Sequence, residues 1–291
     1  MATLKIGKSL KDEDVLWRYV SLEVLINILE SRTLHFSPLA AYRSTDPFEG
    51  YLPKVAMDAM ASISVNFANR RNEQIDDMEL RFGLDKERSE IAQLRADAAK
   101  HSMQIRDVHK SIVSCLMVSC WHRNHHESEA MWGLYSKSGV AIKSTVGSIK
   151  AALEGNQQAH VIHMGAIKYI DFADKTLTAP DCVTDDGHLI GMIKRVAYSH
   201  EKEVRMCITG DVNKDNATSV KPKPAAVDVD TTKLIEGLVI SPFASIPLRN
   251  SIYAISRKYD IGEDKISNSP LLDNCEYLLD SYIMSPSDAA T

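Results

Sequence analysis

The chain has few cysteines, and none of them lie close together in sequence. The five are Cys115, Cys120, Cys182, Cys207 and Cys275, an odd-numbered set without a Cys-x-x-Cys pair. Such a set argues against a disulfide framework and against a thiolate zinc site. We therefore expect reduced thiols, as in a cytoplasmic protein.

The sequence also lacks an excess of positive charge and any long apolar run. Its net charge is −5 and its pI is about 6.1, so there is no overall electrostatic attraction to nucleic acid. No stretch has the apolar length of a signal peptide or a membrane-spanning helix, and we expect a cytoplasmic protein without a membrane partner. The 291 residues, 44% hydrophobic and 25% charged, are typical of a globular protein with a sizeable core.

Hydrophobic periodicity predicts a mixture of strands and helices. Alternating or continuous apolar residues predict strands at 15–20, 33–37, 111–121, 139–144, 160–171, 204–208 and 237–240. Helical spacing predicts helices at 22–29, after Ser21 as N-cap, at 129–135 and at 246–259. We therefore expect one α+β domain over 1–291, built around a central mixed or antiparallel sheet with 111–121 as the core strand.

Two segments are expected to lie outside this sheet. Residues 55–110 are rich in helix-forming residues and are interrupted by Gly83, which predicts a helical insertion of two helices. Its alternating charges are typical of a solvated helix face, and it is also a candidate surface for a protein partner. Residues 211–230 are rich in Lys, Asn, Asp and Pro and predict an exposed loop insertion.

Glu201 and Glu203 flank Lys202 and form the most informative short motif. In a strand, residues at i and i+2 share one face, so both carboxylates would point into the same space. Paired carboxylates in a cleft stabilise a developing positive charge or transfer a proton. The alternative is a charged strand edge that discourages aggregation.

A histidine cluster follows the predicted core strand. His122 and His126 are four residues apart and would share one face of a helix, with His125 between them. No Glu nearby completes a known zinc spacing, so we expect no metal and interpret the segment as a polar loop. A metal-dependent nuclease or hydrolase is the alternative that this cluster leaves open.

Four groups of short motifs, spread over nearly the whole chain, resemble the bacterial family catalogued as domain of unknown function 2971. They are Leu-Trp-Arg-Tyr at 16–19 with Leu-His-Phe-Ser at 34–37 and Asp-Pro-Phe-Glu at 46–49; Met-Trp-Gly-Leu-Tyr at 131–135 with Gly-Val-Ala-Ile at 139–142; Glu-Lys-Glu-Val-Arg at 201–205; and Gly-Leu-Val-Ile-Ser-Pro at 237–242 with Ile-Ser-Asn-Ser-Pro at 266–270. The predicted helical insertion and the predicted loop lie outside the resemblance.

The order of these motifs is also distantly similar to that of the ADP-ribosyltransferase superfamily. There, an early basic residue, a central aromatic or Ser/Thr element and a late glutamate surround NAD. The resemblance assigns these roles to Arg18, Tyr135 and Glu203, with Glu201 beside the late acid. Arg18 would bind the diphosphate, an aromatic ring would pack on nicotinamide, and Glu203 would stabilise the ribose cation. Glu201 would orient or deprotonate the incoming acceptor.

Three further residues are candidates for NAD binding. Tyr19 is the neighbour of Arg18, Trp132 shares a helical face with Tyr135, and Glu49 ends the Asp-Pro-Phe-Glu segment. For Trp132 and the Asp-Pro segment, the alternatives are a core aromatic and an ordinary turn.

The resemblance implies an ADP-ribosyltransferase-like enzyme that cleaves the nicotinamide-ribose bond of NAD. It further implies a bacterial toxin or phage-defence setting and a macromolecular acceptor, protein or nucleic acid. The motifs do not choose between transfer and hydrolysis. The alternative from another functional class is a non-catalytic nucleotide-sensing or protein-interaction module.

Overall fold

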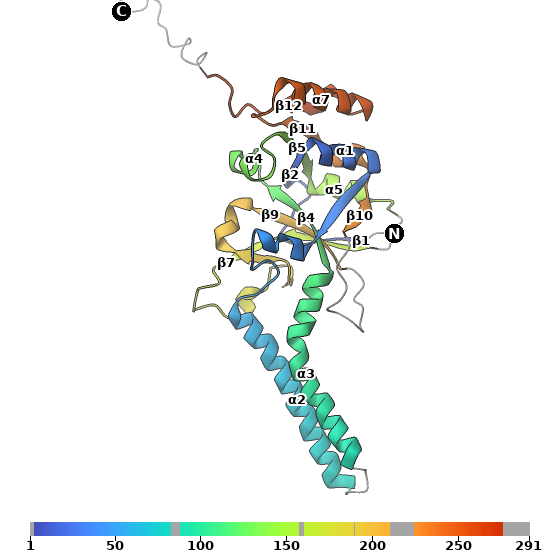
Figure 1. Ribbon diagram of the computed structural model, residues 1–291, viewed down its shortest axis with the longest axis vertical. Helices are drawn as coiled ribbons and strands as arrows, with labels where there is room; N and C mark the ends of the chain where they lie inside the picture. The colour runs from blue at the N-terminus through green and yellow to red at the C-terminus, as the bar shows by residue number, and fades with distance from the viewer. Residues whose placement is uncertain (1–2, 83–87, 157–159, 189, 210–223, 276–291) are drawn as a thin grey trace, which may run out of the picture.

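The computed structural model describes residues 3–82, 88–156, 160–188, 190–209 and 224–275 (Figure 1). The strands are β1 (Thr3–Ile6), β2 (Val15–Ser21), β3 (Thr33–Pro38), β4 (Leu116–Arg123), β5 (Gly139–Thr145), β6 (Val161–Ala166), β7 (Lys168–Ile170), β8 (Ile193–Arg195), β9 (Glu203–Thr209), β10 (Ala225–Asp228), β11 (Gly237–Ile240) and β12 (Ile266–Asn268). The α-helices are α1 (Leu22–Ser31), α2 (Lys54–Phe82), α3 (Arg88–Cys115), α4 (Glu129–Tyr135), α5 (Val146–Leu153), α6 (Thr231–Leu234) and α7 (Ile246–Lys258).

The central sheet is mixed, which places the described chain in the α+β class. Its main path runs β1-β6-β9-β4-β2-β5-β11-β12, while β3 pairs with both β4 and β10. The pairs β1-β6 and β11-β12 are parallel, whereas β4 is antiparallel to β9, β2 and β3. A separate parallel pair, β7-β8, packs beside the sheet.

The sheet divides at β4, and this division determines where a cleft forms. β2 pairs with β4 only at Leu16 and Trp17, opposite Arg123 and His122. At its other end β4 pairs with β3, through Pro38 and its neighbour. Between these two pairings, residues 119–121 of β4 have no ladder partner on this side within the described chain, so the sheet is interrupted between β2 and β3.

The hydrophobic core lies between the central sheet and the helices that pack on it. Leu25, Ile28 and Leu29 form the buried stripe of α1, at the spacing expected for one helical face. They belong to the same core cluster as Leu16 and Ile142 on β2 and β5. The apolar side chains packed between α1 and the sheet therefore hold β2, the strand that carries Arg18, in place.

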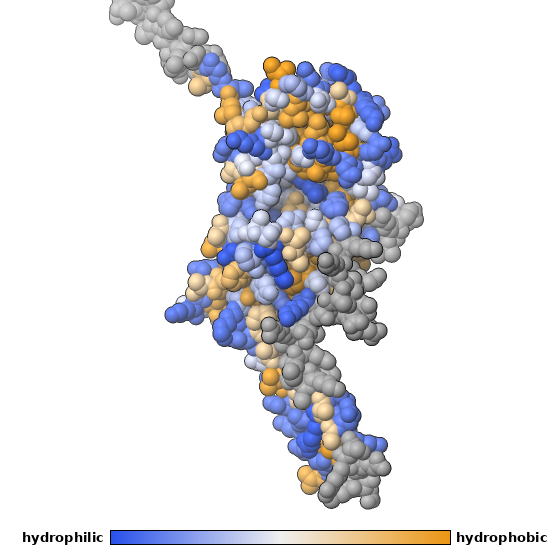
Figure 2. Space-filling view, in the orientation of Figure 1, coloured by the Kyte–Doolittle hydropathy of each residue, from blue (hydrophilic) through white to orange (hydrophobic). Residues whose placement is uncertain are grey.

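A long helical hairpin extends from the body of the protein. α2 and α3 lie side by side and project away from the sheet (Figure 1). The visible described part of this hairpin carries mainly hydrophilic residues, with hydrophobic ones scattered between them (Figure 2). Both helices occupy the segment for which the composition predicts a helical insertion, although residues 83–87 between them lie outside the described part.

The predicted core strand at 111–121 is wrong in its first half. α3 continues to Cys115, and the strand begins only at Leu116 and ends at Arg123. The reason is packing, since Val113 on the last turns of α3 is buried against Leu39 and Leu116. A continuous apolar run does not distinguish a buried helix end from a buried strand.

Two further differences concern pairing between distant segments. The predicted loop at 211–230 includes β10, which pairs antiparallel with β3 from Phe36 to Thr33. Residues 211–223 of that loop lie outside the described part. The short strands β1 and β12 were not predicted. Their sequences are too short to show a strand pattern of their own, and they are strands because they pair with β6 and β11.

The other predicted elements agree with the structure within a few residues, among them β2, β3, β5, β9, β11, α1, α4 and α7. Ser21 precedes α1 as predicted, but its side chain makes no capping hydrogen bond to the helix backbone. Among the described helices, none is long and apolar enough to cross a membrane.

A pair of isoleucine truncations tests the position of the core. Ile142 on β5 is fully buried, whereas Ile63 on α2 is 69% exposed. We expect Ile142→Ala to lower the free energy of unfolding by about 2–5 kcal/mol, because it removes packed methyl groups and leaves a cavity. Ile63→Ala should change it by less than about 0.5 kcal/mol. Urea unfolding measures both, and equal effects would contradict this assignment of the core.

Candidate functional site

A cleft of about 320 Å³ occupies the gap where β2 diverges from β4. This volume lies near the lower end of the range of ~300–1,000 Å³ that is common for small-molecule sites. The described residues that line it are Trp17, Arg18, Tyr19, Val20, Ser21, Val24, Tyr42, Cys120, Trp121, His122, Met131, Tyr135, Lys194, Glu201, Glu203 and Arg205. Five of the predicted site residues thus come together here: Arg18, Tyr19, Tyr135, Glu201 and Glu203.

Glu201 and Glu203 face the same cleft, but not for the reason that the sequence indicates. Glu201 ends a 3₁₀ helix, Val196–Glu201, and Glu203 begins β9. Lys202 between them adopts φ +40 and ψ +47, in the left-handed region. The prediction of one strand carrying both carboxylates is therefore wrong, since a turn at Lys202 directs them to a common space.

Arg205 holds the base of the cleft with all five of its N–H donors. It is 1% exposed, and its donors reach Glu203 at 2.6 and 3.0 Å, Glu49 at 2.8 and 3.4 Å, and the carbonyl of Gly191 at 2.6 Å. A buried guanidinium is stable only when its charge and its donors are satisfied, as they are here. Gly50 follows Glu49 with φ +80, a conformation that favours glycine and lets the chain turn away directly after this carboxylate.

Lys194 links the carboxylates of this cluster. Its Nζ donates to Glu201 Oε2 at 2.5 Å and to Glu203 Oε2 at 3.4 Å, and lies 3.9 Å from Glu49 Oε2. The hydroxyl of Tyr135 donates to the other oxygen of Glu201 at 3.0 Å. The three carboxylates and the two cations, Lys194 and Arg205, leave this ion cluster with a formal charge of −1.

Glu203 is held as an anion by its neighbours. Burial alone would raise the pKa of its carboxyl group, but Arg205 and Lys194 outweigh burial and lower the pKa to about 2. Burial and the nearby Glu201 raise the pKa of Tyr135, so its hydroxyl stays protonated and donates. The ion cluster therefore presents fixed negative charge to the cleft.

Arg18 is the cationic side chain of the cleft that lies outside the ion cluster. Its Nη1 donates to Ser119 Oγ at 3.0 Å and its Nη2 to the carbonyl of His35 at 3.5 Å, and its guanidinium lies 5.7 Å from the ring centroid of Trp121. Within the described chain, no carboxylate lies within ion-pair distance of Arg18. Burial lowers the pKa of this arginine, as expected for a charge without a counter-ion.

Arg18 and Glu203 also project from different faces of the divided sheet. Trp17 pairs with His122, and His122 with Glu203, so these three side chains share one face. Arg18 is the next residue after Trp17 and therefore points to the other face, toward Trp121. The gap between β2 and β4 brings both faces into one cleft.

Three predicted residues have structural roles that the sequence did not separate from binding. Trp132 is fully buried, packs at right angles on Tyr19 and donates to Glu127 at 2.7 Å, so it belongs to the core and does not line the cleft. Glu49 lies beneath the cleft as a partner of Arg205. Tyr19 lines the cleft, and its hydroxyl accepts the backbone N–H of Ser128 at 2.8 Å.

Sequence reasoning missed several residues that shape this site. Lys194 and Arg205 hold the ion cluster together, and Trp121 lines the cleft. His122 also lines it, although the sequence presented this residue only as a candidate metal ligand. A signal for Arg205 was present, because Glu203 and Arg205 stand at i and i+2 of one strand and share a face. Lys194 carried no such signal, since it reaches the cluster from β8.

The histidine cluster does not form a helical face. His122 lies in β4, while His125 and His126 are exposed in the turn that follows. Within the described part of the chain, no group of three His, Cys, Asp or Glu side chains has the arrangement of a metal site.

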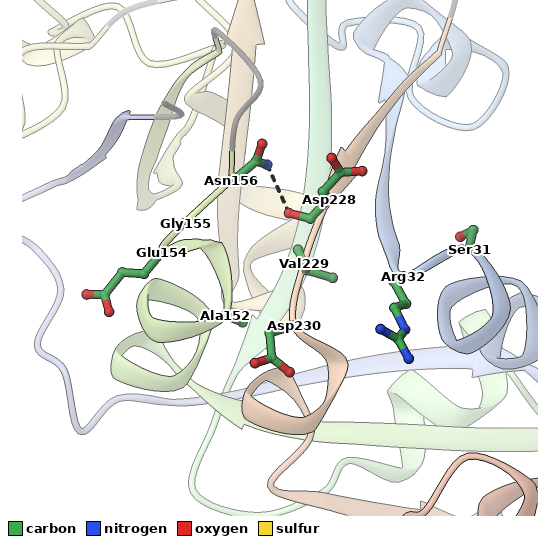
Figure 3. Close-up of a pocket in the computed structure, with 9 residues that line it drawn as sticks. All are labelled: Ser31, Arg32, Ala152, Glu154, Gly155, Asn156, Asp228, Val229 and Asp230. Atoms are coloured by element: carbon green, nitrogen blue, oxygen red, sulfur yellow. Dashed lines mark hydrogen bonds between the residues drawn. The ribbon is translucent and has the colours of Figure 1, made fainter.

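A second hollow, of about 350 Å³, lies near the ends of α1 and α5 and beside β10 (Figure 3). Its polar groups are used by the fold: Asn156 donates to the carbonyl of Asp228 at 2.9 Å, and Asp230 accepts from Thr232 at the start of α6. Arg32 at its rim is exposed. The hollow brings no fixed cluster of charges together, so the cleft at β2 and β4 is the candidate site.

Comparison of the chain with models of known protein families, with curated proteins and with solved structures gave no match. The family resemblance of the short motifs therefore remains an expectation.

The ion cluster predicts how stability depends on pH. Because the pKa of Glu203 is lowered from 4.5 to about 2, its contribution is complete above pH 4.5 and is lost as the pH falls through about 2. A tenfold change in proton affinity is about 1.4 kcal/mol, so this contribution is about 3 kcal/mol.

Urea unfolding in steps from about pH 6 down to about pH 2 measures this contribution. Glu203→Gln should flatten the decline in stability over this range, whereas Glu154→Gln, at an exposed position, should leave the slope as in the wild type. A decline that is unchanged in Glu203→Gln would contradict the assignment.

Proposed function

We propose that this protein binds NAD in the cleft between β2 and β4 and cleaves its nicotinamide-ribose bond, as an ADP-ribosyltransferase or an NAD glycohydrolase. The observation that carries the proposal is the polarity of the cleft. Among the described residues, it has an arginine without a counter-ion and, apart from it, an ion cluster of net charge −1. NAD has the complementary polarity, with an anionic diphosphate and a cationic nicotinamide ring joined through one ribose.

The proposed binding mode follows from this polarity. The fork of donors on Arg18 suits a diphosphate, and the ring nitrogen of Trp121, which has no partner in the described chain, is a further donor on the same face. Tyr135 presents a half-exposed ring beside Glu201 for the nicotinamide. Since the cleft is small for a dinucleotide, the adenosine would extend beyond it.

Glu203 has the central role in the proposed reaction. When the bond to nicotinamide breaks, positive charge develops on the ribose, and a carboxylate fixed nearby stabilises this charge without having to reorganise. Arg205 and Lys194 hold Glu203 in place and ionised. Glu201 accepts hydrogen bonds from Lys194 and Tyr135 and adds a second carboxylate to the negative side of the cleft.

The acceptor of the ADP-ribose, whether water, a protein or a nucleic acid, stays open in this proposal. The toxin or phage-defence setting and the cytoplasmic location rest on the sequence expectations alone. We propose no metal-dependent reaction, because among the described residues no three His, Cys, Asp or Glu side chains are grouped as metal ligands, and His125 and His126 are exposed in the turn after β4.

A nucleotide-binding module without catalysis is the second candidate. It is favoured by the pairing of Glu203 and Glu201 with internal cations, since this arrangement also satisfies a purely structural ion cluster. Such a module would bind NAD through Arg18 but release no nicotinamide. The projecting hairpin of α2 and α3 would then be a surface for a protein partner.

Nicotinamide release and NAD binding, measured separately, test the proposed function. We expect the wild type to release nicotinamide from NAD, with or without cell lysate as acceptor. Glu203→Gln should lower the rate by about 100-fold or more, because it removes the charge that stabilises the ribose cation, while the Kd for NAD changes much less. Chromatography measures release, calorimetry measures binding, and a thermal melt establishes that the variant is folded.

Arg18→Gln tests the anionic end of the cleft. We expect the Kd for NAD to rise by about 10-fold to 100-fold, since charge-assisted hydrogen bonds to the diphosphate are lost. Arg32→Gln, in the second hollow, is the matched control and should leave the Kd unchanged. Binding without release by the wild type would favour the module, and absence of binding would overturn both candidates.

A further inference from the structure

His122 has a ring nitrogen that the fold leaves without a partner. Its Nδ1 lies 2.5 Å from the carbonyl oxygen of Glu201, and because a carbonyl only accepts, Nδ1 must carry the hydrogen. The neutral ring then has a lone pair on Nε2, which is buried and has no hydrogen-bond partner in the described chain. A buried polar atom without a partner is destabilising, so it points to a group that arrives with a ligand.

The position of this residue is as informative as its tautomer. His122 is 3% exposed and lines the cleft. On the neighbouring strand it stands directly opposite Glu203. The imidazole therefore stands on the side of the cleft at which we place the ribose.

The carboxylates of the cleft are poorly suited to accept a proton. Both oxygens of Glu203 accept from Arg205, and one of them also from Lys194. Glu201 accepts from Tyr135 on one oxygen and from Lys194 on the other. A proton on either acid would replace a charge-assisted hydrogen bond that the fold already makes.

The other titratable side chains that line the cleft keep their protons at neutral pH. Burial raises the pKa of Tyr19 and of Tyr42 to about 12, and the pKa of Cys120 well above its ordinary value. Burial lowers the pKa of Lys194, but the carboxylates around it outweigh that effect and keep it protonated. Among the described residues of the cleft, His122 is the neutral base that remains.

We propose that Nε2 of His122 accepts the proton of the nucleophile that attacks the ribose carbon, so that this histidine is the general base of the reaction. This inference rests on the proposed function. The bond between the ribose carbon and nicotinamide breaks, and its electron pair goes to the ring nitrogen, which becomes neutral. A hydroxyl oxygen of water or of an acceptor bonds to the ribose carbon, and its proton moves to Nε2.

The surroundings of His122 set the direction of the pH dependence. Burial lowers its pKa below the ordinary 6.5, as do Lys202 and His200, while Glu201 raises it. Tyr19 on β2 and Glu203 on β9 face it from the neighbouring strands. The imidazole is therefore unprotonated at neutral pH, and activity should fall as the pH drops through this lowered pKa.

Access to Nε2 requires a small movement of the cleft wall. The rings of Tyr19 and His122 meet edge to face, with centroids 6.3 Å apart. The proposed role therefore requires that the ring of Tyr19, whose hydroxyl accepts from the backbone N–H of Ser128, shifts when the nucleophile binds.

The test compares rate profiles of nicotinamide release between about pH 4.5 and about pH 8.5. His122→Asn keeps a side-chain donor for the carbonyl of Glu201 but removes Nε2. We expect kcat to fall by about 10²-fold to 10⁴-fold and the acidic limb of the profile to disappear, with little change in KM. His163→Asn is the matched control, because His163 also has a pKa lowered by burial but lies on β6, outside the cleft.

Azide distinguishes a base from a residue that only positions Glu201. As an anionic nucleophile azide needs no base, so it should restore a large part of the rate of His122→Asn and yield azido-ADP-ribose. If the Asn variant does not fold, as judged by circular dichroism, His122→Gln is measured in the same way.

The outcomes separate the two proposals. A wild type that releases no nicotinamide overturns the proposed function and this role with it. A wild type that releases nicotinamide, with a variant at His122 that keeps its rate and its acidic limb, overturns the role of His122 alone. Loss of rate without rescue by azide also overturns it, because His122 would then only hold Glu201 in position.

Discussion

The buried ion cluster around Arg205 is the constraint on which the site depends. A guanidinium that is 1% exposed would be strongly destabilising without partners, and here it has an acceptor for each of its donors. Its partners come from distant parts of the chain, since Glu49 follows β3, Gly191 precedes β8 and Glu203 begins β9. Satisfying one side chain therefore fixes three separate segments at the floor of the cleft.

The interrupted ladder between β2 and β4 is the second feature that forms the cleft. Because the ladder between β2 and β4 ends at Trp17, the side chain of Arg18 spans the gap and donates to Ser119 on β4. The same interruption opens the space above Glu203. A cation and a net negative cluster thus meet in one cleft although their side chains start from opposite faces of the sheet. In a continuous sheet, the backbone ladder would separate them.

Local pattern accounted for most elements of the fold, since periodicity depends on which face of a strand or helix is buried. The distant family resemblance, and not periodicity, selected Arg18, Tyr135 and Glu203, which the structure brings to one cleft. Periodicity could not supply the pairing of β10 with β3 or the end of α3 at Cys115, because packing between distant segments decides both. Glu201 shows the limit of such reasoning: its direction is set by the left-handed turn at Lys202, which the spacing of two glutamates does not reveal.

The protonation state of the cleft narrows the reactions that it suits. Hydrolysis of an ordinary glycoside needs a carboxylic acid that protonates the departing oxygen, and hence an acid whose pKa is raised. Here the pKa of Glu203 is lowered to about 2, and Glu201 accepts hydrogen bonds on both oxygens. Nicotinamide needs no proton to leave, because it departs from a pyridinium as a neutral ring. A cleft whose described carboxylates are both held by cations, with one neutral imidazole, is therefore better suited to the NAD reaction that we propose than to a sugar with an oxygen leaving group.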